Sequence, residues 1–197
     1  MPPPHELRAW TLQRDGLTYT LSTDPSLLDL AAINAAYASD MLYWAKPLPP
    51  ATLKLCVEQS LCFGLYAHGT HDQSQAATNG SDGHGSKGEM IGFARLITDY
   101  TTFGYLTDVY VLAAHQGRGL GKWMMRCLDE VLNLWPHLRR CVLFTSGAGA
   151  VRMYRETLGA KDVAETSFLR GLVLMEKAGP AGAVVTRKKG EEDGGRE

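Results

Sequence analysis

Long apolar runs, paired cysteines and a basic leader are missing from this sequence of 197 residues. No apolar stretch reaches the roughly 20 residues of a membrane-spanning helix, and the opening Pro2-Pro3-Pro4 lacks the basic and apolar regions of a secretory signal. The 4 cysteines show no Cys-x-x-Cys spacing, so we expect reduced core residues and not a metal site or disulfides. These absences favour a cytoplasmic protein without a membrane partner or a metal, and they leave entry into the nucleus open.

An excess of charge of either sign is also missing. The chain carries 20 Lys and Arg against 21 Asp and Glu, a formal net charge of -1. We therefore expect no nucleic-acid partner, because such a partner needs a basic surface. Hydrophobic residues make up 45% and charged residues 21%, which is ordinary for a globular protein of one well-filled domain.

Two stretches depart from this ordinary composition. Residues 69–88 consist almost wholly of small and polar residues, and residues 179–197 are rich in glycine and mixed charge. Neither stretch offers enough apolar surface to order itself. We therefore expect a single domain over residues 1–178 with a flexible insertion at 69–88, followed by a disordered tail at 179–197.

The remaining sequence alternates between strand and helix patterns. Asp15-Gly16 separates two alternating runs, Trp10 to Arg14 and Leu17 to Ser22, which is typical of a hairpin. Ser26 is placed to cap a helix that covers Leu27 to Asn34. The further elements that we expect are a helix from Pro50 with Leu61 on its apolar face, strands at 62–67, 90–98, 141–145 and 168–175, and helices at 120–134 and 150–158.

The stretch from Tyr105 to Arg126 combines three kinds of sequence. Its first third is rich in β-branched and aromatic residues, as a buried strand is. Gly117, Gly119 and Gly121 follow closely, and from Leu120 the apolar residues recur with helical spacing. A strand, a glycine-rich turn and a helix place free backbone N–H groups and the positive end of the helix around one point. Such a point binds an anion, most often a phosphate.

Spacing narrows the choice of phosphate ligand. A dinucleotide fingerprint needs Gly-x-Gly-x-x-Gly, and Gly117-Arg118-Gly119-Leu120-Gly121 is one residue short of it. A Walker-type loop needs Ser or Thr after Gly-Lys, whereas Trp123 follows Lys122 here. The pattern that fits is Gln-x-x-Gly-x-Gly, which begins at Gln116. A tight strand-to-helix turn without a ligand is the alternative.

This motif, between a strand and a helix, resembles the pyrophosphate-binding signature of the GNAT superfamily of acetyl-CoA-dependent N-acetyltransferases. Strings such as Tyr43-Trp44-Ala45, Gly92-Phe93-Ala94-Arg95 and Gly104 to Val109 are similar to one little-characterised subgroup of that family. The resemblance covers roughly Trp10 to Glu176. It implies an α/β (α+β) fold in which helices flank both faces of a mixed, splayed central sheet. It also implies acetyl-CoA as co-substrate, without a metal.

The resemblance further assigns residues to the cofactor. The pantetheine arm would pair with the backbone of the strand, and the diphosphate would lie on the amides of the turn. Arg118 either adds a charge-assisted contact or stays solvated. The residues expected to bind the cofactor are Val109, Tyr110, Val111, Gln116, Gly117, Arg118, Gly119, Leu120, Gly121 and Lys122.

Acetyl transfer to an amine needs an acid for the leaving thiolate and a base for the ammonium proton. Many family members use a tyrosine on the helix after the fifth strand as the acid, and Tyr154 has that place. The segment from Thr157 to Ala160 departs from the Gly-Phe ending of the family, so a packed core tyrosine is the alternative. Asp108, an acidic residue in an apolar strand, is the candidate base. A structural carboxylate, with water as the base, is the alternative for it.

The sequence says least about the molecule that accepts the acetyl group. Tyr43 and Trp44 lie where the family builds its substrate wall, and Tyr105 joins them as a candidate; plain packing is the alternative for all three. No acidic groove for basic peptides is evident, so we expect an N-acetyltransferase acting on a primary amine of a small molecule. The alternatives are an acetyl-CoA-binding module without turnover and a protein or peptide lysine acetyltransferase. The resemblance leaves a homodimer open.

Overall fold

The computed structural model describes residues 6–69 and 88–165. Most of the expected insertion, residues 70–87, lies outside the described residues, as do the expected strand at 168–175 and the tail at 179–197. The described elements up to Asp162 belong to one unit. The 3-10 turn η5 (Val163–Glu165) is the described part of a second unit.

The described strands of the first unit form a six-stranded mixed sheet in the order β1-β2-β3-β4-β5-β6. Neighbouring strands are antiparallel except for β5 and β6, which are parallel. Asp15 and Gly16, both with positive φ, form the tight turn between the first two strands, as the sequence predicts. The strands are β1 (Ala9–Arg14), β2 (Leu17–Ser22), β3 (Leu61–His68), β4 (Glu89–Thr98), β5 (Phe103–Val111) and β6 (Arg140–Leu143).

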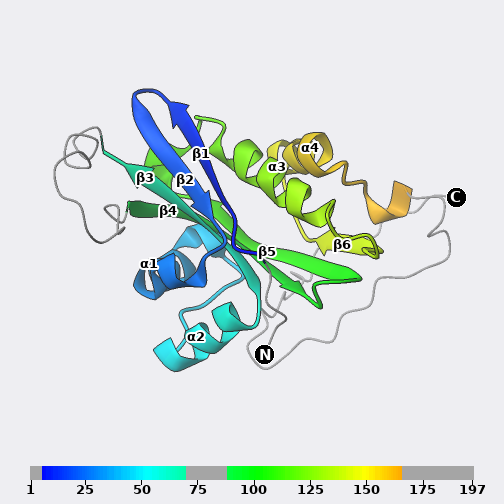
Figure 1. The fold of residues 1–197 in the computed structure, drawn as a ribbon, viewed down its shortest axis with the longest axis horizontal. Coiled ribbons are helices and arrows are strands. Elements are labelled where there is room, and N and C mark those ends of the chain that lie inside the picture. The colour runs from blue at the N-terminus through cyan, green and yellow to red at the C-terminus, as the bar shows by residue number, and fades with distance from the viewer. Residues whose placement is uncertain (1–5, 70–87, 166–197) are drawn as a thin grey trace, which may run out of the picture. The chain divides into compact units, whose positions relative to one another are not determined.

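Helices cover both faces of this sheet, with α1 and α2 on one face and α3 and α4 on the other (Figure 1). Two apolar cores result, because alternate side chains of a strand point to opposite faces: Phe63 lies in one core and Cys62 in the other. The predicted α+β fold is therefore confirmed. The helices are α1 (Leu30–Tyr37), α2 (Pro50–Glu58), α3 (Leu120–Leu132) and α4 (Ala148–Leu158), with single 3-10 turns at η1 (Pro25–Leu27), η2 (Asp40–Leu42) and η4 (Ala113–His115).

The start of the first helix differs from the prediction. Ser26 does not cap it and instead lies within η1, where its N–H donates to the Asp24 carboxylate. The α-helix begins after Asp29, whose side chain accepts hydrogen bonds from the N–H groups of Ala31 and Ala32. Asp24 and Asp29 thus take the capping role that we expected of Ser26: Asp24 caps η1 and Asp29 caps α1.

Further boundaries also differ. The strand predicted at 141–145 is β6, which ends at Leu143, and the helix predicted at 120–134 is α3, which ends at Leu132. Leu61 does not continue the apolar face of α2, because that helix ends at Glu58 and Leu61 begins β3 in the core. Helix α4 begins at Ala148, earlier than predicted, after Gly147 with a φ of 85°. Glycine adopts a positive φ without steric cost, so the turn between β6 and α4 ends at Gly147 and the helix can begin at the next residue.

Candidate functional site

Strands β5 and β6 separate within the sheet. They pair in parallel from Phe103, opposite Arg140, as far as Leu106, opposite Leu143. Strand β6 ends there, whereas β5 continues to Val111. Beyond Leu106, the β6-facing edge of β5 has no strand partner among the described residues. Its backbone groups can therefore pair with an extended ligand, as they would with another strand.

A β-bulge at Asp108 accompanies this separation. The register between β4 and β5 shifts between Phe93 and Arg95, so that β4 places one residue opposite Asp108 and Val109. Asp108 has a φ of 54°, a left-handed conformation that costs a residue other than glycine roughly 1–2 kcal/mol. Such a conformation persists only where neighbouring groups hold it, and it is found most often at functional sites.

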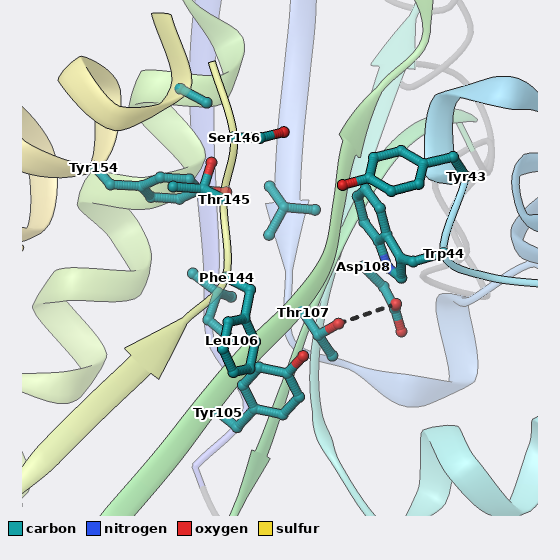
Figure 2. Close-up of a pocket in the computed structure, with 12 residues that line it drawn as sticks. Tyr43, Trp44, Tyr105, Leu106, Thr107, Asp108, Phe144, Thr145, Ser146 and Tyr154 are labelled. Atoms are coloured by element: carbon teal, nitrogen blue, oxygen red, sulfur yellow. Dashed lines mark hydrogen bonds between the residues drawn. The ribbon is translucent and has the colours of Figure 1, made fainter. Parts of the chain in front are cut away.

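Side chains from several elements hold the Asp108 carboxylate. Its Oδ2 accepts hydrogen bonds from the Tyr37 hydroxyl on α1 at 2.8 Å and from Arg95 Nε on β4 at 2.7 Å. Its Oδ1 accepts one from the Thr107 hydroxyl at 3.2 Å, drawn in Figure 2. Burial and the negative charge of Asp108 raise the pKa of Tyr37, so this phenol remains a donor. The bulge is thus fixed by a buried ion pair and a buried hydroxyl.

The glycine turn after β5 has the geometry of an anion site. Gly117 and Gly119 have φ values of 77° and 72°, and Gly119 precedes α3 without a capping side chain. The first N–H groups of α3 therefore have no partner inside the helix. Gln116 Nε2 donates to the carbonyl oxygen of Val111 at 2.8 Å and so ties the turn to the end of β5.

Two arginines lie at this turn. Arg118 Nη1 lies 3.3 Å from the Tyr19 hydroxyl and 3.8 Å from Asp15 Oδ2, so it packs against the β1–β2 hairpin. Arg14, from that hairpin, donates to the carbonyl oxygen of Arg118. A Cβ built on Gly119 would come within 2.6 Å of Arg14 Nη1. Arg14 thus brings a positive charge to the turn from a part of the chain far away in sequence.

Lys122 and Gly121 connect α3 with α4. Lys122 Nζ lies 2.6 Å from Glu156 Oε2, and the hydrogen bond lowers the pKa of Glu156. A Cβ on Gly121 would lie 3.4 Å from Met153 Sδ. Gly121 thus faces α4, and Lys122 shares its charge with a carboxylate of that helix.

A cleft of about 410 Å³ opens where β5 and β6 separate. In Figure 2, Tyr43, Trp44 and Asp108 lie on one side of it, and Thr145, Ser146 and Tyr154 lie on the other. Its described lining residues are Tyr43, Trp44, Tyr105, Leu106, Thr107, Asp108, Val109, Phe144, Thr145, Ser146, Ala150 and Tyr154.

Tyr154 has the properties of a proton donor. It is a buried residue of α4, and burial raises its pKa to about 12. The phenol is therefore protonated near neutral pH. Its hydroxyl has no hydrogen-bond partner in the part of the chain that the structure describes, so the proton can be donated to a group in the cleft.

The structure brings together many of the residues singled out from the sequence, although their roles stay predictions. Tyr43, Trp44, Tyr105, Asp108, Val109 and Tyr154 line the cleft. The residues from Gln116 to Lys122 form the adjacent turn and the start of α3, and Tyr110 and Val111 complete β5 between the two.

Sequence reasoning missed Arg14 and the cleft residues Leu106, Thr107, Phe144, Thr145, Ser146 and Ala150. Phe144 and Thr145 end a predicted strand and Ser146 follows it, and ligands of open α/β sheets bind beyond the carboxyl ends of the strands, which was a usable signal. Nothing local in the sequence connects Arg14 with the glycine turn.

Two kinds of feature are absent from residues 6–69 and 88–165. They contain no group of three or more His, Cys, Asp and Glu side chains that could hold a metal ion. They also contain no helix with the length and apolar character needed to cross a membrane.

Comparison with known proteins gives consistent results. Residues 43–160 match the family described as "Acetyltransferase (GNAT) family". A protein of Gibberella zeae, whose name gives acetyltransferase as a provisional activity, is 42% identical over 162 residues. That alignment covers 82% of this chain and 90% of the relative.

Solved structures agree with this result. A crystal structure from Xanthomonas campestris pv. campestris, provisionally described as a GNAT-family acetyltransferase, has 34% sequence identity and a TM-score of 0.58. The match covers 83% of this chain and 94% of that one. A Staphylococcus aureus structure with 16% identity and a TM-score of 0.53 covers 81% of this chain and 99% of its own, and it shows the shared fold alone.

Proposed function

We propose that this chain, which belongs to the acetyltransferase (GNAT) family, transfers the acetyl group of acetyl-CoA to a primary amine of a small molecule. The acetyl donor and the amine would bind together in one ternary complex. The family uses acetyl-CoA as its acetyl donor. The observation that carries the proposal is the cleft between β5 and β6, which has a protonated phenol, Tyr154, on one side and a carboxylate, Asp108, on the other. Acyl transfer to an amine needs an acid beside the leaving sulfur and a base beside the attacking amine.

The glycine turn and the open edge of β5 fit acetyl-CoA. We assign the diphosphate to the free N–H groups at the start of α3, where the helix dipole favours an anion. Arg14 and Arg118 add positive charge beside those groups. The amides of the pantetheine arm would pair with the unpaired backbone of β5 from Val109 to Val111.

The chain's own side chains then account for the protons. The amine nitrogen forms a bond to the acetyl carbon as the carbon–sulfur bond breaks. Tyr154 gives its hydroxyl proton to the departing sulfur and regains one from solvent. Asp108 accepts a proton from the ammonium on Oδ1, the oxygen bound only by Thr107 among the described residues, and later releases it to solvent. The second nitrogen proton passes to solvent directly. A backbone N–H near Val111 would stabilise the negative charge on the acetyl oxygen.

The cofactor assignment is tested by isothermal titration with acetyl-CoA, ATP and NAD. We expect the protein to bind acetyl-CoA and neither of the others. Gly119→Glu should weaken acetyl-CoA binding at least roughly 100-fold, because the added carboxylate would repel the diphosphate at close range. Gly159→Glu is the matched control, since Gly159 also follows a left-handed path, with a φ of 61°, but lies at the far end of α4.

The control separates strain from electrostatics. Both substitutions force a side chain onto a positive φ and so add similar backbone strain. Gly119→Glu must also displace the end of the Arg14 side chain, a contact that Gly159→Glu lacks. If Gly159→Glu weakens acetyl-CoA binding as much as Gly119→Glu does, or if neither weakens it, the diphosphate does not lie on this turn.

A further inference from the structure

Of the five aromatic rings among the described lining residues, four form two pairs, and Tyr154 is the fifth. Tyr43 and Trp44 meet edge to face, with ring centroids 4.9 Å apart. Tyr105 and Phe144 do the same at 5.7 Å. The first pair comes from the segment after η2, and the second joins β5 to the residue after β6. Figure 2 shows the two pairs on different sides of the cleft.

These rings are not packed as core residues are. Tyr43 is 73% exposed, Phe144 67% and Trp44 45%, whereas the core rings of Tyr19 and Phe63 are 0% exposed. Internal packing therefore explains the cleft rings poorly. Aromatic surface that faces a hollow and is left uncovered is typical of a ligand-binding site.

The charge of the cleft limits what can bind there. Asp108 provides the only carboxylate among the described lining residues, and Arg95 already neutralises it from behind. Its Oδ1 accepts a hydrogen bond only from Thr107 among the described residues and so keeps the capacity to accept one more, from a single ammonium group. A second cationic group of the same ligand would find no carboxylate in this lining and would lose its hydration. The cleft thus suits a ligand with one positive charge.

We propose, resting on the function proposed above, that the acceptor is a primary monoamine joined through a short chain to an aromatic ring. The ring lies between the pairs Tyr43–Trp44 and Tyr105–Phe144, where offset and edge-to-face contacts are favourable. The amine points to Asp108. The volume of about 410 Å³ is at the low end for ligand pockets and is shared with the acetyl end of the donor, so it accommodates one small ring system.

The first test compares acceptors with purified full-length protein and saturating acetyl-CoA, following release of the CoA thiol. The panel is 2-phenylethylamine, ethylamine, spermidine and a short peptide with one lysine. We expect kcat/KM for 2-phenylethylamine to exceed that for ethylamine roughly 10- to 100-fold, because burial of the phenyl group stabilises the complex. We expect spermidine and the peptide to be poorer still.

The second test uses Trp44→Ala and Phe144→Ala. Each should lower kcat/KM for 2-phenylethylamine roughly 10-fold, mainly through KM, and should lower kcat/KM for ethylamine much less, so that the preference for the aromatic amine falls. Phe103→Ala is the matched control, because Phe103 is an exposed aromatic residue of β5 that does not line the cleft. This control should leave the preference for the aromatic amine intact.

The failures of the two proposals are distinguishable. If spermidine, the peptide or ethylamine is acetylated as well as 2-phenylethylamine, or if both alanine variants keep the full preference, the aromatic acceptor site is wrong while the amine acetyltransferase stands. If no amine in the panel releases CoA thiol above the rate without acceptor, the proposed function fails, and the acceptor inference fails with it.

Discussion

Replacing Tyr154 by Phe removes one oxygen atom from the cleft and keeps the ring. Because the hydroxyl has no partner among the described residues, its loss breaks no hydrogen bond in that part of the chain. We therefore expect the free energy of unfolding to change by less than about 0.5 kcal/mol. A loss of kcat in Tyr154→Phe can thus be told apart from a loss of stability.

The size of the catalytic effect follows from the surroundings of the phenol. Burial raises the pKa of Tyr154 from 10.0 to about 12, well above that of a thiol in water. A departing thiolate is a weaker base than this phenol, so the phenol shares its proton with the sulfur in the transition state and does not give it up beforehand. Partial proton transfer from Tyr154 stabilises the departing thiolate. Because Tyr154→Phe removes this donor, we expect its kcat to fall roughly 100-fold, which corresponds to about 2.7 kcal/mol in the activation barrier.

The assay measures kcat by thiol release at saturating acetyl-CoA between pH 6 and pH 9. Tyr154 remains protonated over this range, so the deficit of Tyr154→Phe should not depend on pH. Tyr66→Phe is the control, because the Tyr66 hydroxyl is also buried without a described partner but does not line the cleft. A Tyr154→Phe variant that keeps more than half of the kcat, or a Tyr66→Phe variant that loses as much, would refute the assignment of the acid.

Two further substitutions test the remaining assignments. Arg14→Met should weaken acetyl-CoA binding roughly 10-fold at low salt and less at 1 M salt, because salt screens an exposed charge. The control, Arg8→Met, should leave the affinity unchanged. A loss of affinity that is the same at both salt concentrations would contradict a charge contact. Asp108→Asn should lower kcat roughly 100-fold near neutral pH and progressively less as the amine acceptor loses its own proton at higher pH. A deficit that is equal at every pH would mean that Asp108 only holds the bulge and that water is the base.

Features that depend on neighbouring residues were predictable from the sequence. The hairpin follows from Asp15-Gly16, since both positions adopt the positive φ that a two-residue turn requires. The turn before α3 follows in the same way from Gly117 and Gly119. The apolar repeat from Leu120 correctly predicts the buried side of α3. In each case the chemistry that decides the structure lies within a few positions.

Features that depend on distant partners were not predictable. Asp108 meets Tyr37 across 71 positions, and Arg14 meets the carbonyl of Arg118 across 104 positions. The sequence indicates an acidic residue in an apolar strand and gives a reason to expect a partner, but no pattern identifies which one. The bulge is equally hidden, because an extra residue in β5 appears only when β4 is paired beside it.

The buried network around Asp108 is better explained by geometry than by stability. A buried ion pair such as Asp108–Arg95 contributes little net stability, since the cost of removing both charges from water offsets their attraction. The left-handed backbone of Asp108 adds a cost of its own. These two unfavourable contributions occur at the residue of β5 that lies beside the cleft, just beyond the last pairing of β5 with β6. If Asp108 is the base that we propose, its replacement should therefore cost more in activity than in the free energy of unfolding.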